Sequence, residues 1–159
     1  MWTPEQVGRT CQPVTRYPYT SSNTDVWDIV KSADRDESNP EHIVLLYTRY
    51  RLTPGTAGRE YASGWSREHV WPKSLGGMNT DSPGMGTDAH NLFCADTSMN
   101  STRSNKCFDW GGSTVTDNSP SAGYDGTTHC LADNDSWEPP DEAKGVVARA
   151  IFYMACAYA

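Results

Sequence analysis

The C-terminal segment places the firmest constraint on the fold of this 159-residue chain. Pro139 and Pro140 favour the start of a helix, and Asp141 and Glu142 suit its first turn, where the backbone dipole favours negative charge. Apolar residues then recur at helical spacing, at Val146, Val147, Ala150, Ile151 and Met154. This pattern predicts an amphipathic helix packed against a core. The pattern is still running at Ala159, so we expect part of the C-terminal segment to be absent.

Regular patterns elsewhere predict one further helix and one strand. Asn23 or Thr24 can cap a helix whose first turn is suited to Asp25. The apolar residues on one face of this helix are Val26, Ile29, Val30 and Ala33. The apolar run 43–47 predicts a buried strand, and a short helix is expected around residues 95–106. Residues 1–22 carry three prolines and should be irregular, so we expect one domain over residues 23–159.

The rest of the chain is dominated by loop-forming residues. Hydrophobic residues make up only 36% of the sequence, whereas aromatic residues reach 11%. This composition is typical of a loop-rich α+β domain whose core relies on Trp and Tyr, and we assign Trp65 and Trp71 to that core. The longest apolar run, residues 150–159, is far shorter than the ~20 residues that a membrane-spanning helix needs. We therefore expect no membrane partner.

The five cysteines leave two interpretations open. They are scattered and form no C-x-x-C pair, which argues against a structural zinc site. One or two disulfides with a free thiol are as compatible with the sequence as buried apolar thiols.

The net charge of −7 argues against a general affinity for polyanions. The acidic excess lies mainly after residue 116, however, and five basic residues balance five acidic residues between Arg59 and Lys106. A divalent cation bound in this neutral region would make it positive.

Two polar runs in that region carry the residue types that phosphodiester hydrolysis needs. The first places Glu68 beside His69, and the second contains Asn100. A neutral imidazole can take a proton from water near pH 7, so His69 is the candidate general base. Carboxylate and amide oxygens suit Mg²⁺, Mn²⁺ or Ca²⁺, so Glu68 and Asn100 are the candidate metal ligands. Because strand neighbours point to opposite faces, Glu68 and His69 can serve one site only where the backbone bends at a strand end.

Further polar residues are candidates for contacts with the substrate. Arg103 can bind phosphate bidentately, or it can pair with Asp96 or Asp109. His90, next to Asn91, fits a role in holding loops together by hydrogen bonds rather than that of a base. The other candidates for substrate binding are Arg67, Lys73 and Asn105.

Four motifs, in order, resemble the endonuclease I family of periplasmic or extracellular nucleases. They are residues 67–74 (REHVWPKS), 88–92 (DAHNL), 100–106 (NSTRSNK) and 137–145 (WEPPDEAKG). The resemblance implies a His-Me finger (ββα-metal) core with surrounding helices and long loops. Phe93 and Cys94 stand where the family often has an arginine and a proline.

The resemblance also implies the chemistry. His69 matches the family's general base, and Glu68 and Asn100 match the ligands of one Mg²⁺-like ion. It implies a secreted or periplasmic endonuclease, expected to be monomeric, that cleaves DNA, often also RNA, with little sequence preference. The products would carry 5′-phosphates.

Two other classes of function are compatible with parts of the sequence. A nuclease fold without turnover would be a nucleic-acid-binding or interaction module, which the net acidity permits. A disulfide-stapled binding domain is permitted by the cysteines but does not explain the ordered polar motifs. Serine-hydrolase and zincin chemistry are excluded, because the chain has no G-x-S-x-G and no H-E-x-x-H.

Overall fold

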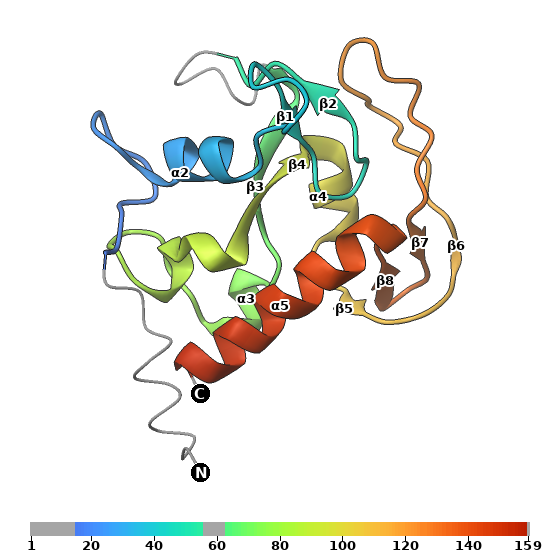
Figure 1. The fold of residues 1–159 in the computed structure, drawn as a ribbon. Helices are drawn as coiled ribbons and strands as arrows, with labels where there is room; N and C mark the ends of the chain where they lie inside the picture. The colour runs from blue at the N-terminus through green and yellow to red at the C-terminus, as the bar shows by residue number, and fades with distance from the viewer. Residues whose placement is uncertain (1–14, 56–62, 159) are drawn as a thin grey trace.

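The computed structural model describes residues 15–55 and 63–158 and has an α+β fold (Figure 1). The α-helices are α2 (Val26–Ala33), α3 (Lys73–Gly76), α4 (Thr97–Arg103) and α5 (Asp141–Tyr158), and two 3₁₀ turns are η2 (Met85–Thr87) and η3 (Ala89–Asn91). The strands are β1 (Ile43–Val44), β2 (Arg51–Leu52), β3 (Trp65–His69), β4 (Leu92–Asp96), β5 (Cys107–Phe108), β6 (Ser113–Thr114), β7 (Leu131–Ala132) and β8 (Ser136–Glu138).

The antiparallel pair β3–β4 forms the centre of the molecule. Its register places Trp65 opposite Asp96 and His69 opposite Leu92, so 22 residues connect the two paired ends. β1 and β2 form a second antiparallel pair, and the other four strands form a sheet in the order β5-β8-β7-β6. α4 follows β4 directly, which gives the strand, strand, helix order expected of a ββα core. The assignment to the His-Me finger itself stays a prediction.

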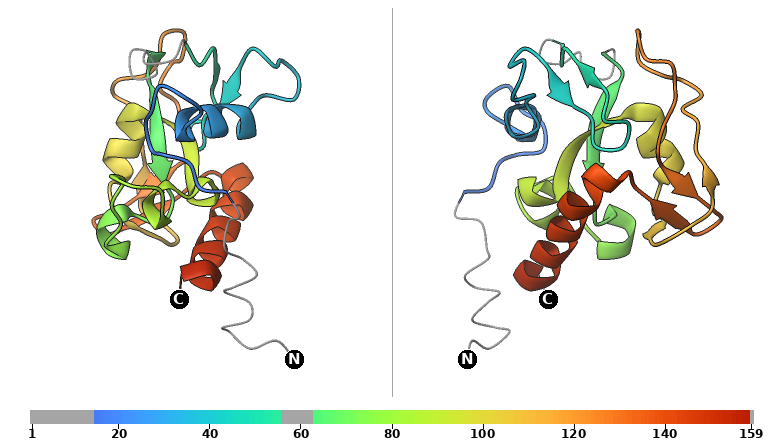
Figure 2. Two further views of the ribbon diagram at one scale, coloured as in Figure 1. Left: turned by 90° about the vertical axis from the view of Figure 1, so that its left-hand side faces the viewer. Right: turned by 45° about the vertical axis from the view of Figure 1, so that its right-hand side comes forward.

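Two apolar clusters cover the opposite faces of β3–β4. Leu92 and Cys94 of β4 belong to the cluster that contains Trp65 and the buried side of α2. Ala95 belongs to the other cluster, together with residues of α4 and α5. This alternation follows the pleat of the strand, in which successive side chains point to opposite faces. Figure 2 shows α5 along one side of the central pair and the long connection between β6 and β7 beside α4.

The helices predicted from the sequence are present, with corrected ends. α2 is capped by Asp25, which accepts hydrogen bonds from the backbone N–H of Trp27 and Asp28, so the predicted caps Asn23 and Thr24 are wrong. Trp27 is buried on α2, whereas Ala33 is exposed. α5 confirms the C-terminal helix and is described up to Tyr158.

Other expectations are met only in part. The apolar run 43–47 forms a strand only at β1, and Leu45, Leu46 and Tyr47 are buried in a turn. Residues 15–22 form no helix or strand, whereas residues 1–14 lie outside the described part of the chain. Trp65 is buried as expected, but Trp71 is only half-buried.

The described cysteines occur as thiols. Cys94 and Cys130 are buried, Cys107 and Cys156 are exposed, and all four are free, while Cys11 lies outside the described residues. Of the helices in residues 15–55 and 63–158, none is both long and apolar enough to cross a membrane.

Candidate active site

A pocket of about 570 Å³ lies at the C-terminal end of β3. It gathers six of the seven predicted site residues, although they come from β3, α3, α4 and the turn after α4. Its lining consists of Tyr19, Arg67, Glu68, His69, Pro72, Lys73, Ser74, Asn100, Ser104 and Asn105. Arg103 is the predicted residue that does not line it.

His69 is held in one orientation by the loop that connects β3 to β4. Its Nε2 lies 2.8 Å from the carbonyl oxygen of Gly86. A carbonyl only accepts, so Nε2 carries the proton, and Nδ1 is the unprotonated nitrogen of the neutral ring. Burial, together with the nearby Lys73 and Arg67, lowers the pKa of His69 to about 4, against the effect of the hydrogen bond to Gly86. His69 is therefore neutral at pH 7.

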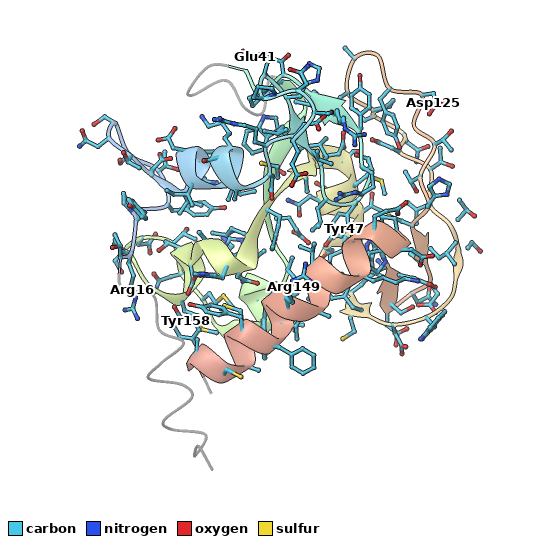
Figure 3. The ribbon with its side chains drawn as sticks, viewed as in Figure 1. Arg16, Glu41, Tyr47, Asp125, Arg149 and Tyr158 are labelled. Atoms are coloured by element: carbon cyan, nitrogen blue, oxygen red, sulfur yellow. The ribbon has the colours of Figure 1, made fainter. Side chains whose placement is uncertain are left out.

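Glu68 points to the opposite face of β3, as the pleat requires. Its Oε1 accepts hydrogen bonds from Tyr47 Oη at 2.5 Å and from Arg103 Nη1 at 2.9 Å. Tyr47 lies in the interior beside α5 (Figure 3). Burial raises the pKa of Glu68 to about 7, while Arg103 and Tyr47 oppose that rise. Both bonds fall on one oxygen, so Oε2 is the atom through which this carboxylate can bind a ligand in the pocket.

Asn100 reaches the same pocket from α4. Its amide nitrogen donates to Ser66 Oγ at 3.0 Å and to the carbonyl of Arg67 at 3.3 Å. These two bonds fix the amide plane and leave Oδ1 as the acceptor. Asp96 caps α4 through the N–H groups of Ser98 and Met99, which sets the position of the helix relative to β4.

Arg103 is buried beneath the pocket, with only 1% of its surface exposed. Its Nη1 donates to Glu68 Oε1 and to the carbonyl of His69, and its Nη2 donates to the carbonyl of Val70 at 2.7 Å. The alternative partners Asp96 and Asp109 are wrong, because the ion pair is with Glu68. This placement favours a structural role over the predicted contact with phosphate.

The three candidates for substrate binding differ in how strongly each side chain is held by contacts within the protein. Arg67 lies over the rings of Tyr19 and Trp27 and donates to the carbonyl of Tyr19, so it fastens the segment before α2 while bordering the pocket. Lys73 and Asn105 are exposed at the pocket's rim. Their predicted role fits this position and stays a prediction.

The DAHNL run supports the pocket without lining it. Asp88 accepts from His90 and also from the hydroxyls of Tyr153 and Tyr158 on α5, at 2.8 Å each. His90 stacks on Tyr153, which agrees with its expected role in holding loops together. Tyr158, the other tyrosine that donates to Asp88, is labelled in Figure 3. Buried Asn91 exchanges two hydrogen bonds with the backbone of Trp71 and so fixes the chain as it leaves β3.

Three residues around the site were missed by sequence reasoning. They are Tyr19, which stacks on His69, Gly86, which orients it, and Tyr47, which binds Glu68. A side chain at Gly86 would collide with the carbonyl of Asn79, so the glycine permits the tight loop that presents its carbonyl. The glycine-rich composition of residues 76–86 was a signal for such a loop, whereas nothing in the sequence links Tyr19 or Tyr47 to the site.

The candidate metal ligands of the site are oxygen atoms. In the described part of the chain, no group of three or more His, Cys, Asp or Glu side chains is placed to hold a metal ion. A cation here would be held by the carboxylate of Glu68 and the neutral oxygen of Asn100, a donor set that suits hard divalent ions.

Comparison with known proteins finds relatives among extracellular ribonucleases. The extracellular ribonucleases of Bacillus amyloliquefaciens and Bacillus subtilis (strain 168) are each 44% identical to this chain over 137 residues. The match covers 86% of this chain but 44% of each relative, so the chain spans less than half the length of these relatives. The sequence model of the Endonuclease I family matches residues 12–159, and the chain belongs to that family.

Proposed function

We propose that this chain is an endonuclease that hydrolyses phosphodiester bonds of nucleic acid, with His69 as its general base. The observation that carries the proposal is the hydrogen bond from His69 Nε2 to Gly86. It leaves Nδ1 free to take a proton from an attacking water at the pocket. The low pKa of His69 keeps the ring in its basic form at neutral pH.

Glu68 and Asn100 would hold a divalent cation such as Mg²⁺, with Mn²⁺ or Ca²⁺ as alternatives. Glu68 Oε1 and the amide nitrogen of Asn100 are already bound to the protein, which supports a ligand role for the remaining oxygens. When bound, such an ion neutralises charge on the phosphate and assists the leaving oxygen. This contribution matters here because the chain is acidic overall.

DNA and RNA both fit the proposed substrate class. Lys73 and Asn105 offer contacts to phosphate at the rim, and contacts of this kind carry no sequence information. The relatives are called ribonucleases, which favours RNA as one of the substrates. Their names also support an extracellular location. We also propose that the enzyme acts as a monomer and gives 5′-phosphate products, as the resemblance of the motifs implies.

Cleavage assays on plasmid DNA and structured RNA, with Mg²⁺ or with EDTA, test the activity. We expect metal-dependent degradation of both. His69→Ala should lower the rate about 10²- to 10⁴-fold, the usual contribution of a general base, without loss of DNA binding. The matched control is His129→Ala, because His129 is exposed and does not line the pocket. Binding without cleavage under every metal would instead identify an inactive nucleic-acid-binding module.

A titration of the cleavage rate with Mg²⁺ tests the ligand assignment separately. Asn100→Ala and Glu68→Gln should both raise the Mg²⁺ concentration needed for half-maximal rate, because each weakens the oxygen set. Asn105→Ala serves as control and should leave that concentration unchanged. Equal metal dependence in all three variants would show that the ion is held elsewhere.

A further inference from the structure

A second cluster of acidic side chains lies away from the pocket, where the connection between β6 and β7 meets the start of α4. Asp96 and Asp117 are both buried there, with 1% and 4% of their surface exposed. Asp96 Oδ2 accepts from Ser121 Oγ at 3.1 Å, and Asp117 Oδ1 accepts from the N–H of Ser119 at 2.9 Å. Ser98 Oγ contacts Oδ1 of both carboxylates. The two acidic groups therefore face each other across one hydroxyl.

The hydrogen bonds in this cluster do not satisfy its oxygens. Ser98 has a single hydroxyl proton, so it can donate to only one of the two carboxylates that it touches. Oδ2 of Asp117 is buried and has no hydrogen-bond partner among the described residues. Burying a charged oxygen without a partner costs free energy, and the described residues supply no partner for this one. This oxygen therefore points to a bound ligand or ion as its partner.

The cluster also lacks a compensating positive side chain. Among residues 15–55 and 63–158, no lysine or arginine pairs with Asp96 or Asp117. Burial raises the pKa of Asp96, and the charge of Asp117 adds to that rise. The two carboxylates are thus enclosed with neutral hydrogen-bonding groups only.

We propose that Asp96 and Asp117 bind a structural Ca²⁺ ion, separate from the catalytic metal. All donors at hand are oxygens: two carboxylates, the hydroxyls of Ser98 and Ser121, and the carbonyl of Gly64, which lies 3.5 Å from Ser121 Oγ. Ca²⁺ accepts such irregular oxygen sets, whereas Mg²⁺ demands near-octahedral geometry. A bound cation would take up the unpartnered oxygen and balance both charges.

The position of this cluster gives the ion a role. Asp96 caps α4, the helix that carries Asn100, and Asp117 belongs to a connection that runs out along the side of the molecule as far as Asp125 (Figure 3). Tyr50 also holds this connection, through stacking on Tyr124 and a hydrogen bond to Ala122. The ion would thus tie a long surface connection to the helix that carries a proposed ligand of the catalytic metal.

Thermal unfolding of the full chain with CaCl₂ or EDTA tests this site. Glu68→Gln is used as the background, so that the active-site ligands do not contribute. At a Ca²⁺ concentration about a hundredfold above Kd, we expect the Tm of this background to rise by about 5–10 °C. Isothermal titration should give one bound Ca²⁺ per chain.

Asp117→Asn, added to that background, distinguishes the outcomes. It should abolish the Ca²⁺-dependent rise, yet in EDTA it should be at least as stable as the background, because it removes a buried charge. Asp133→Asn is the matched control: Asp133 lies in an exposed turn and bonds only to that turn, and the control should keep the full rise. If Ca²⁺ has no effect on the background, or shifts both Asp117 forms equally, the proposal is overturned.

Discussion

Replacing Arg103 by methionine separates the two roles that this arginine can have. If Arg103 contacted phosphate, the variant would fold normally and lose activity. The structure instead gives the guanidinium three buried hydrogen bonds, to Glu68 Oε1 at 2.9 Å and to the carbonyls of His69 and Val70 at 3.0 and 2.7 Å. The variant should therefore lose stability first.

The size of the loss follows from what the substitution leaves behind. At a pH well above the pKa of Glu68, which burial raises to about 7, removing one partner of a buried ion pair costs about 3–5 kcal/mol, because the other charge stays buried without compensation. Glu68 is 3% exposed, so little water can replace the arginine. A loss of this size is a large fraction of the about 5–15 kcal/mol that a domain has in total. The loss should shrink at low pH, because protonation removes the charge from Glu68.

Urea unfolding of the wild type, Arg103→Met, Glu68→Gln and the double variant measures this coupling. In the Arg103→Met background, Glu68→Gln should cost at least about 2 kcal/mol less than in the wild type, because it neutralises a stranded charge. Lys144→Met is the control: its pair with Glu138 and Asp141 is solvent-accessible and should contribute much less than the buried pair. An Arg103→Met variant within about 1 kcal/mol of wild-type stability but with a lower kcat would refute this reasoning and restore the contact with phosphate.

Three further predictions concern stability. Burial raises the pKa of Asp34 from 3.8 to about 6, so the folded state binds the proton more tightly and stability falls as pH rises from about 4 to above 6. Urea unfolding at pH 5 and pH 8 should therefore show the stability of Asp34→Asn rising by about 1.5 kcal/mol relative to the wild type. A difference that does not change with pH would contradict the assignment. Asn91→Ala strands the backbone N–H and carbonyl of Trp71 and should cost about 2 kcal/mol in the same assay, whereas a neutral effect would mean that water replaces both bonds. Tyr47→Phe removes the hydroxyl donor to Glu68 and should cost about 1–2 kcal/mol, and an unchanged unfolding midpoint would show that this bond adds nothing.

Local patterns in the sequence predicted the elements whose stabilising features are local. The stripe of α5 and its acidic first turn lie within one segment, and its helix is present. The cap of α2 was misplaced because several polar residues precede that helix, although the bonds from the N–H groups of Trp27 and Asp28 to Asp25 are themselves local.

Interactions between distant residues could not be read from the sequence. Arg103 meets Glu68 across 35 positions, and Tyr47 meets the same carboxylate across 21. An arginine near a candidate metal site fits a contact with phosphate and a buried ion pair equally well until its burial is known. Six of the seven residues that the motifs single out line one pocket, while the partners of each side chain required the structure.

The end of β3 explains how two adjacent residues serve one pocket from opposite faces. Glu68 faces the cluster that contains Tyr47, whereas His69 faces Tyr19 and the loop that carries Gly86. Both line the pocket because they are the last two residues of the strand, after which Asn91 holds the departing chain by its bonds to Trp71. Because the two side chains lie on separate faces, different neighbours set the pKa of each. Burial beside cations keeps the ring of His69 neutral, while Arg103 and Tyr47 oppose the rise that burial causes in the pKa of Glu68.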